Sequence, residues 1–301
     1  MENENFDVII IGGSYSGLSA GMSLGRSLRN VLIIDNGKPC NRQTPHSHNF
    51  ITHDGKTPAE IAQLAKKDVE KYNTVKFYNG TVAKTINTTE GFDIEISSGE
   101  KFHAKKLILA SGIKDIMPDI PGFTECWGIS VLHCPYCHGY EVKNEVTGIL
   151  SNGDMAYEFS KLIFNMTKNL TLFTNEKATL TDEQVEKLNQ NKIILNEDEI
   201  AGIEHENGSI QKIVFKNGKE IALQALYAKI PFEQNINASG DLGCELTEQG
   251  FIKIDMMQKT TVPGVFACGD NVTMMRSVAN AIAQGNFTGA VVNKELSDEE
   301  F

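Results

Sequence analysis

The stretch Phe6-Asp7-Val8-Ile9-Ile10-Ile11-Gly12-Gly13-Ser14-Tyr15-Ser16-Gly17 decides the fold of this 301-residue chain. Its apolar first half predicts a buried strand, and a turn built from glycine and serine follows directly. Beyond the turn, residues 18–26 predict a helix with small residues on one side. A second apolar strand over residues 30–34 ends at Asp35, which completes a βαβ unit.

The small residues of the turn each have a physical reason to be there. Gly12 lets the strand turn sharply, and Gly17 lets the helix pack close to the strand. Ser14 stands where the backbone would face a pyrophosphate and where glycine is usual, but serine is small and can donate a hydrogen bond. Asp35 lies at the distance at which an acid holds a ribose hydroxyl. The unit therefore predicts a dinucleotide site, and a plain βαβ unit is the alternative.

Length and composition limit the number of domains and the classes of partner. A chain of 301 residues predicts about two domains. The net charge of −11 argues against a nucleic acid or an anionic membrane as partner. No apolar run approaches the ~18 residues of a membrane helix, and the first residues are acidic rather than a basic leader. We expect a cytoplasmic protein with no nucleic-acid and no membrane partner.

A second short stretch, Cys134-Pro135-Tyr136-Cys137-His138, carries the chemistry. In a reducing compartment, two cysteines at this spacing indicate a thiol–disulfide redox centre or half of a zinc site. A second ligand pair at comparable spacing is missing from the sequence, so we expect no metal. The other cysteines are interpreted as ordinary small or buried residues: Cys40, Cys126, Cys244 and Cys268.

Between these two stretches the sequence predicts a polar loop over residues 36–57, which contains His46, His48 and His53. The loop is either an ordinary surface loop or one that folds over a ligand through Arg42, Gln43 or Asn49. A helix capped by Thr57 follows and runs to about Tyr72.

Further along, alternating stretches over residues 75–104 suggest a small antiparallel meander. Residues 106–110 predict a buried strand. Pro118, Pro121 and Gly122 then predict a linker and a domain boundary near residues 114–122. A second βαβ pattern begins at Val146, and a long helix begins near Ser277.

Taken together, the sequence resembles the low-molecular-weight thioredoxin reductases, which are two-domain flavoproteins. Four motifs carry the resemblance, and their order and spacing cover almost the whole chain. They are the glycine loop Gly12–Gly17, Ala110-Ser111-Gly112, the cysteine pair and Gly264-Val265-Phe266-Ala267-Cys268-Gly269-Asp270.

The resemblance implies an α/β fold with two Rossmann-like three-layer dinucleotide-binding domains, the second inserted in the first. Residues 1–117 and 242–301 would form a discontinuous FAD-binding domain. Residues 118–241 would form an NAD(P)-binding-like domain that carries the cysteine pair. The resemblance also implies a homodimer.

The same resemblance implies that Asp270 binds the ribityl chain of FAD and that Arg276-Ser277-Val278 lies along the flavin ring. A helix that starts near Ser277 would direct its free N–H groups at the electron-rich edge of that ring. The expected cofactor-binding residues are Gly12, Ser14, Gly17, Asp35, Arg42, Gln43, Asn49, Val82, Ala110, Ser111, Gly112, Gly269, Asp270, Arg276, Ser277 and Val278.

The segment His133–Glu141 is more narrowly similar to the branch of the fungal dithiol oxidases, which close disulfides in small sulfur-bearing metabolites. The reductases carry aspartate directly after the second cysteine, where this chain has His138. The resemblance implies that Cys137 faces the flavin and that Cys134 exchanges with substrate. We assign His138 as an acid/base, and a histidine that merely helps to start a helix is the alternative. The substrate would be a thioredoxin-like protein or a small dithiol or disulfide metabolite.

The second glycine loop departs from the reductases. Its first glycine is replaced by Ser151, and the run that grips a 2′-phosphate reads Thr174-Asn175-Glu176-Lys177. A phosphate site favours arginine forks, which this run lacks. Glu176 could hold a ribose hydroxyl and favour NADH, or the domain binds no nicotinamide and the flavin is served by oxygen or ferredoxin. A reductase, a dithiol oxidase and a non-enzymatic flavoprotein redox sensor all stay open.

Overall fold

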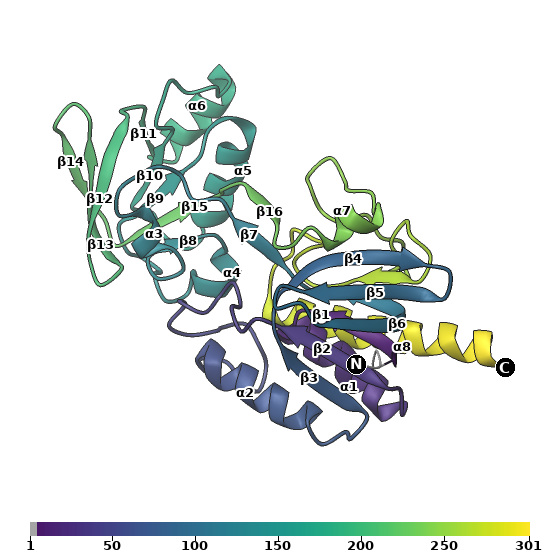
Figure 1. Ribbon diagram of the computed structural model, residues 1–301. Coiled ribbons are helices and arrows are strands. Elements are labelled where there is room, and N and C mark those ends of the chain that lie inside the picture. Colours follow the sequence, from purple (N-terminus) through teal and green to yellow (C-terminus); the bar gives the residue numbers. More distant parts are fainter. Residues whose placement is uncertain (1–4) are drawn as a thin grey trace. The chain divides into compact units, whose positions relative to one another are not determined.

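The computed structural model describes residues 5–301, and the first four residues of the acidic N-terminal stretch lie outside them. The chain forms two compact units, drawn in Figure 1. Unit 1 holds the residues up to Arg42, Lys56–Lys114 and Phe232–Phe301, and unit 2 holds Gln43–Gly55 and Asp115–Pro231. The predicted boundaries at 117/118 and 241/242 separate an FAD-binding domain from an NAD(P)-binding-like domain. These boundaries stay a prediction. The grouping of residues 43–55 with unit 2 was not expected from the sequence.

Unit 1 is built on a seven-stranded sheet in the order β3-β2-β1-β6-β5-β4, with β17 beside β6. Its central strand, β1, pairs in parallel with both β2 and β6. Val8, Ile9 and Ile10 are therefore fully buried, which explains the unbroken apolar run. The strands are β1 (Asn5–Ile11), β2 (Val31–Asp35), β3 (Val75–Asn79), β4 (Val82–Thr88), β5 (Gly91–Ile96), β6 (Lys101–Leu109) and β17 (Val265–Ala267).

This sheet corrects the expected meander. Val75–Asn79 pairs in parallel with β2, so the antiparallel part contains only β4, β5 and β6. Residues 101–109 form one strand instead of two. Its first half pairs with β5 and its second half lies between β1 and β17. Alternation shows which face of a strand is buried but does not identify its partner.

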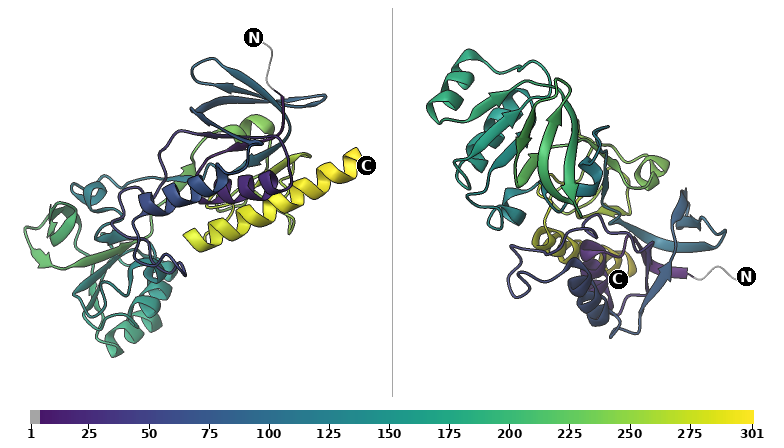
Figure 2. Two further views of the ribbon diagram at one scale, coloured as in Figure 1. Left: turned by 90° about the horizontal axis from the view of Figure 1, so that it is seen from below. Right: turned by 90° about the vertical axis from the view of Figure 1, so that its left-hand side faces the viewer.

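The helices of unit 1 are α1 (Tyr15–Arg26), α2 (Pro58–Val69), α7 (Ala238–Leu242) and α8 (Val278–Glu300). The start of α2 is confirmed: Thr57 and Glu60 form a capping box, and Pro58 occupies the first turn. Helix α8 lies alongside α1 (Figure 2). The backbones meet closely, because a Cβ at Gly285 would lie 2.0 Å from the carbonyl oxygen of Ser16.

Unit 2 is built on a parallel sheet in the order β11-β10-β9-β15-β8. These strands are β8 (Val131–Leu132), β9 (Thr147–Leu150), β10 (Leu170–Phe173), β11 (Ile194–Asn196) and β15 (Ala225–Ala228). A three-stranded antiparallel sheet of unit 2 holds β12 (Ile200–Glu206), β13 (Ser209–Phe215) and β14 (Glu220–Ala222). The short strands β7 (Ile113–Asp115) and β16 (Phe232–Gln234) pair with each other where the chain passes between the units, and most of their residues belong to unit 1. The helices are α3 (Phe123–Cys126), α4 (Pro135–His138), α5 (Gly153–Ile163) and α6 (Asp182–Gln190).

Both units therefore have the Rossmann-like sheet that the sequence predicts. Among residues 5–301, none of the helices has the length and apolar character needed to cross a membrane.

We predict that Gly285→Ala destabilises the protein by about 2 kcal/mol, although alanine improves helix propensity by about 1 kcal/mol. The added methyl group overlaps the Ser16 carbonyl, so α8 has to move away from α1. Thermal unfolding measures the effect. Gly202→Ala is the control, because a Cβ there would meet its nearest atom at an ordinary 3.4 Å. Equal melting temperatures for the two variants would contradict the prediction.

Candidate functional site

The first glycine loop is packed so tightly that only glycine fits. Gly12 has a φ of +109°, and a Cβ there would lie 2.3 Å from the Ala110 carbonyl oxygen. A Cβ at Gly17 would lie 1.8 Å from the Gly12 carbonyl oxygen. Ser14 is the N-cap of α1, but its side chain makes no capping hydrogen bond within residues 5–301. The first N–H groups of α1 are therefore available to an anion such as a pyrophosphate.

Asp35, at the end of β2, holds the loop in place. Its Oδ1 accepts a hydrogen bond of 2.9 Å from Gly13 N, and its Oδ2 accepts one of 3.0 Å from Gly37 N. Sequence reasoning missed this anchoring role. Each carboxylate oxygen retains a further lone pair, so a contact with a ribose hydroxyl stays a prediction.

The strands β6 and β17 end at the same edge of the sheet as β1. The Ala110-Ser111-Gly112 segment follows β6, and Gly269 follows β17 with its N–H donating to Gln284 Oε1 at 2.7 Å. Asn271 is fully buried and donates from Nδ2 to the Leu109 carbonyl at 2.9 Å. Its Oδ1 has no hydrogen-bond partner among the residues that the structure describes. A buried acceptor of this kind fits a ligand that brings a donor to this edge.

The start of α8 lies near Asp270. Arg276 Nε is 3.5 Å from Asp270 Oδ2, and the Ser277 hydroxyl caps the helix by accepting from Asn280 N at 3.1 Å. Because α8 contacts α1 at Ser16 and contacts Gly269 through Gln284, the N-termini of both helices reach this edge of the sheet. Two helix N-termini at one edge favour a ligand with negative charge.

Most of the predicted cofactor residues thus gather at one edge of unit 1, where the glycine cradle and the buried Asn271 acceptor fit FAD. These residues are Gly12, Ser14, Gly17, Asp35, Ala110, Ser111, Gly112, Gly269, Asp270, Arg276, Ser277 and Val278. Their contacts with FAD stay predictions.

Four other predicted cofactor residues are placed differently. The Val82 side chain is in the apolar core of unit 1, so only its backbone could face a ligand. Arg42 donates to the Pro39 carbonyl at 3.1 Å. Gln43 and Asn49 belong to unit 2. Their assignment to FAD stays a prediction without a contact to support it.

The cysteine pair lies at the carboxyl end of β8 in unit 2 (Figure 1). Cys134 is the N-cap of the short helix α4, and Pro135 occupies its first turn. The amides of Cys137 and His138 donate to the Cys134 carbonyl at 3.3 and 3.2 Å. Both cysteines are half-buried. Over residues 5–301, no three His, Cys, Asp or Glu side chains gather as a metal site.

The remaining cysteines differ from this pair. Cys126, Cys244 and Cys268 are buried, and burial raises the pKa of each thiol, to about 12 at Cys268. These three thiols stay protonated and unreactive near neutral pH. Cys40 is exposed.

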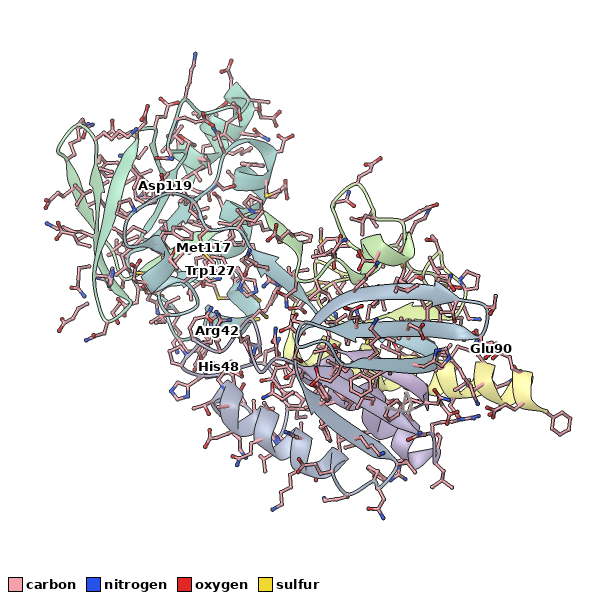
Figure 3. The ribbon with its side chains drawn as sticks, viewed as in Figure 1. Arg42, His48, Glu90, Met117, Asp119 and Trp127 are labelled. Carbon is pink, nitrogen blue, oxygen red and sulfur yellow. The ribbon has the colours of Figure 1, made fainter. Side chains whose placement is uncertain are left out.

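His138 has charged neighbours from another part of the chain. Burial is the main cause that lowers its pKa, His48 lowers it further, and Glu141 opposes them. His48 comes from the segment 43–55 and is labelled in Figure 3. Its Nδ1 lies 3.6 Å from both Glu141 Oε1 and Asp54 Oδ2. The polar loop thus contributes to the surroundings of the cysteine pair, which its sequence alone did not establish. The His133 ring packs 6.0 Å from that of Trp127.

The sequence profile described as pyridine nucleotide-disulphide oxidoreductase matches residues 6–285. The chain belongs to this family. It is 30% identical to thioredoxin reductase tcpT of Claviceps purpurea over 304 residues, covering 96% of this chain and 94% of that protein.

Two crystal structures extend the comparison. One is TrxB of Bacillus anthracis, assigned as a thioredoxin reductase, with 30% identity, a TM-score of 0.94 and coverage of 98% and 100% of the two chains. The other is an oxidoreductase of Agrobacterium tumefaciens, with 36% identity, a TM-score of 0.92 and coverage of 98% and 99%. The chain is therefore a disulfide oxidoreductase of thioredoxin reductase type, a family of FAD-binding enzymes. The narrower similarity to dithiol oxidases stays a prediction.

The family also implies a pyridine nucleotide. In unit 2 the loop between β9 and α5, where such a nucleotide would bind, is held by hydrogen bonds of the Asn152 side chain. Asn152, the N-cap of α5, accepts at Oδ1 from Gly153 N (2.8 Å), Thr179 N (2.9 Å) and Thr179 Oγ1 (3.2 Å). Its Nδ2 donates to the Lys177 carbonyl (3.0 Å) and to Glu176 Oε1 (3.4 Å). One amide thus ties together the loops that follow β9 and β10, over which a dinucleotide would lie.

The charges of this loop are also unfavourable. Asp154 lies in the first turn of α5, where its Oδ1 accepts from Gln184 Nε2 at 2.8 Å. Glu176 stands where a 2′-phosphate needs a cation. These residues do not fit a phosphate-bearing dinucleotide.

We predict that Glu141 and His48 shift the pKa of His138 in opposite directions. Glu141→Gln lowers this pKa further, because the carboxylate that stabilises the imidazolium is lost. His48→Gln raises it, because a like charge is removed. NMR titration of the His138 ring measures both shifts, with His103→Gln as a control in unit 1. A shift in the same direction in both variants would refute this electrostatic account.

Proposed function

We propose that this enzyme exchanges two electrons between a dithiol or disulfide substrate and the Cys134–Cys137 pair, with FAD held by unit 1. The observation that carries the proposal is the Cys-x-x-Cys at the start of α4, in a chain whose other unit builds a glycine cradle around the start of α1. FAD, when bound, supplies a two-electron donor and acceptor. Family membership favours this enzyme over the non-enzymatic redox sensor.

The thiol chemistry can be written with its electrons balanced. In the oxidising direction, one substrate thiolate attacks Cys134 Sγ of the disulfide, the Cys134–Cys137 bond breaks, and Cys137 leaves as a thiolate. The second substrate thiolate attacks the substrate sulfur of the mixed disulfide and releases Cys134. The substrate loses two electrons and two protons, and the pair gains the electrons. In the reducing direction the steps run in reverse.

His138 is suited to take one of these protons. It immediately follows Cys137, and its lowered pKa keeps the ring neutral near pH 7, so that a ring nitrogen can accept a proton from a thiol. Glu141 then stabilises the imidazolium that forms. The role of His138 as acid/base is therefore part of this proposal.

For the substrate we propose a thioredoxin-like protein or a small dithiol or disulfide metabolite. The names of the related thioredoxin reductases support the first. The exposed Tyr136 and Tyr140 on either side of the pair's second cysteine offer aromatic surface to both. A reducing, cytoplasmic location and a homodimer belong to the same proposal.

The closed loop at Asn152 favours a second candidate function, a dithiol oxidase that uses oxygen. In that case the substrate dithiol and dioxygen give the substrate disulfide and hydrogen peroxide, with no nicotinamide in the cycle. A protein donor such as ferredoxin is the remaining alternative for a reductase.

We predict that Cys134→Ser lowers the rate of dithiol oxidation or disulfide reduction by about a thousandfold or more, because the attacked sulfur is lost. Steady-state assays with dithiothreitol and with thioredoxin measure the rate. Cys244→Ser, at a buried cysteine in the core of unit 1, is the control and retains activity. FAD absorbance verifies that both variants keep the cofactor. Unchanged turnover in Cys134→Ser would overturn the proposed function.

We further predict that NADPH and NADH leave the flavin absorbance of the wild-type protein unchanged under nitrogen, whereas dithiothreitol bleaches it and air restores it. The reason is that Asn152, Asp154 and Glu176 close the nucleotide loop and leave it acidic. Asn152→Gly with Glu176→Arg gives measurable reduction by NADPH, since it opens the loop and adds a phosphate ligand. Rapid bleaching of the wild type by NADPH would establish a nicotinamide-fed reductase instead.

A further inference from the structure

Tyr227, on β15 of unit 2, is a buried phenol that the mechanism above does not use. Its side chain has 0% exposure, and its hydroxyl has no hydrogen-bond partner in the described part of the chain. A buried hydroxyl without a partner is costly, and removal of such a group by an apolar replacement of the same shape is close to neutral. A state of the enzyme that supplies an acceptor for this hydroxyl would remove that cost.

The sheet places Tyr227 beside the strand that leads into the cysteine segment. Its register partners are Leu132 on β8 and Ile149 on β9. Directly paired residues share a face of the sheet, and on this face the Tyr227 ring meets Phe159 of α5 edge-on at 5.8 Å. Leu132 lies in the same apolar cluster as Tyr227 and precedes Cys134 by two residues. Val142, five residues after Cys137, packs against that cluster too.

The charges that act on Tyr227 come from the same place. Burial is the largest cause that raises its pKa far above the ordinary value, and negative charge on Cys134, Glu141 and Cys137 adds to the rise. The phenol thus keeps its proton at any physiological pH. Of the neighbouring charges, the Cys134 thiolate acts on it most strongly.

We propose that the Tyr227 hydroxyl donates a hydrogen bond to the Cys134 thiolate when the pair is reduced. The proposal rests on the proposed role of Cys134 and Cys137 as the redox pair. A disulfide sulfur carries no charge and is a weak acceptor, whereas a thiolate is a strong one. The bond therefore forms on reduction, and Tyr227 makes the pair easier to reduce and Cys134 easier to deprotonate.

The test compares Tyr227→Phe with the wild type in the holoenzyme, without turnover. The pair is equilibrated with glutathione redox buffers, and the reduced fraction is read by mass spectrometry after alkylation. At pH 9 the equilibrium constant for reduction falls about tenfold in the variant, which is about 30 mV for a two-electron couple. The difference shrinks towards pH 6, because a protonated thiol accepts the bond poorly. In Tyr227→Phe, the pH at which reduced Cys134 reacts half-maximally with iodoacetamide shifts to a higher value, because the thiolate has lost a hydrogen-bond donor.

Tyr157→Phe is the matched control, because it removes the same atom from a half-buried ring on α5 that packs against the same apolar cluster. It leaves both the equilibrium and the alkylation profile unchanged. Thermal unfolding of Tyr227→Phe shows no loss of stability, since an unsatisfied hydroxyl has been removed.

Two outcomes would overturn the inference. One is a Tyr227→Phe variant with wild-type equilibrium and alkylation profile, which would mean that the hydroxyl bonds to buried water. The other is a change of the same size at pH 6 and pH 9, which would mean altered packing and not a lost bond to a thiolate. Failure of the proposed function looks different: the wild-type pair itself would then form no disulfide in any glutathione buffer.

Discussion

The close approach of backbones around the start of α1 is the constraint on which the rest of unit 1 depends. The helix touches the glycine loop at Gly17 on one side and α8 at Ser16 on the other, and neither contact leaves room for a Cβ. Small residues are therefore required on both α1 and α8. The consequence is functional as well as structural. Helix α8 packs against α1 and also against the sheet, through Val292 and Leu296. The start of α1 is thereby held at the edge where β1, β6 and β17 end.

The two Rossmann-like units differ in the residue that caps the helix after their first strand. In unit 1, the N-cap Ser14 leaves the start of α1 open to an anion, and Asp35 is engaged in holding the loop. In unit 2, the N-cap Asn152 turns its amide onto its own backbone and onto the neighbouring loop. Sheet order and helix placement are alike, so the fold alone cannot predict the ligand of the second unit. The difference between the two units is in their side chains, above all Asn152, Asp154 and Glu176 of unit 2.

Much of the fold could be predicted from the sequence, because its strongest signals are local. The apolar run of β1, the capping box at Thr57 and the long helix after Ser277 depend on neighbours within a few residues. The partner of Val75–Asn79 could not be predicted, since strand pairing depends on residues far away in the chain. The same limit explains the site. Gly12 and Gly17 could be recognised from their spacing in the sequence. His48 lies near Glu141 because of the path of the loop, and Tyr227 lies beside the strand before the cysteines because of the sheet register. Neither contact can be read from local sequence.

The surroundings of the cysteine pair combine neutral donors with groups that carry charge. His138 is kept neutral mainly by burial, and Tyr227 is kept protonated by burial and by negative neighbours. Glu141 acts on both groups, since its negative charge raises the pKa of His138 and the pKa of Tyr227. A carboxylate beside a thiolate would by itself disfavour reduction of the pair. A histidine that gains a proton and a phenol that offers one both oppose that effect. In the proposed scheme, Glu141 on one side and His138 and Tyr227 on the other therefore act in opposite directions on reduction of the pair, which a cysteine motif alone does not reveal.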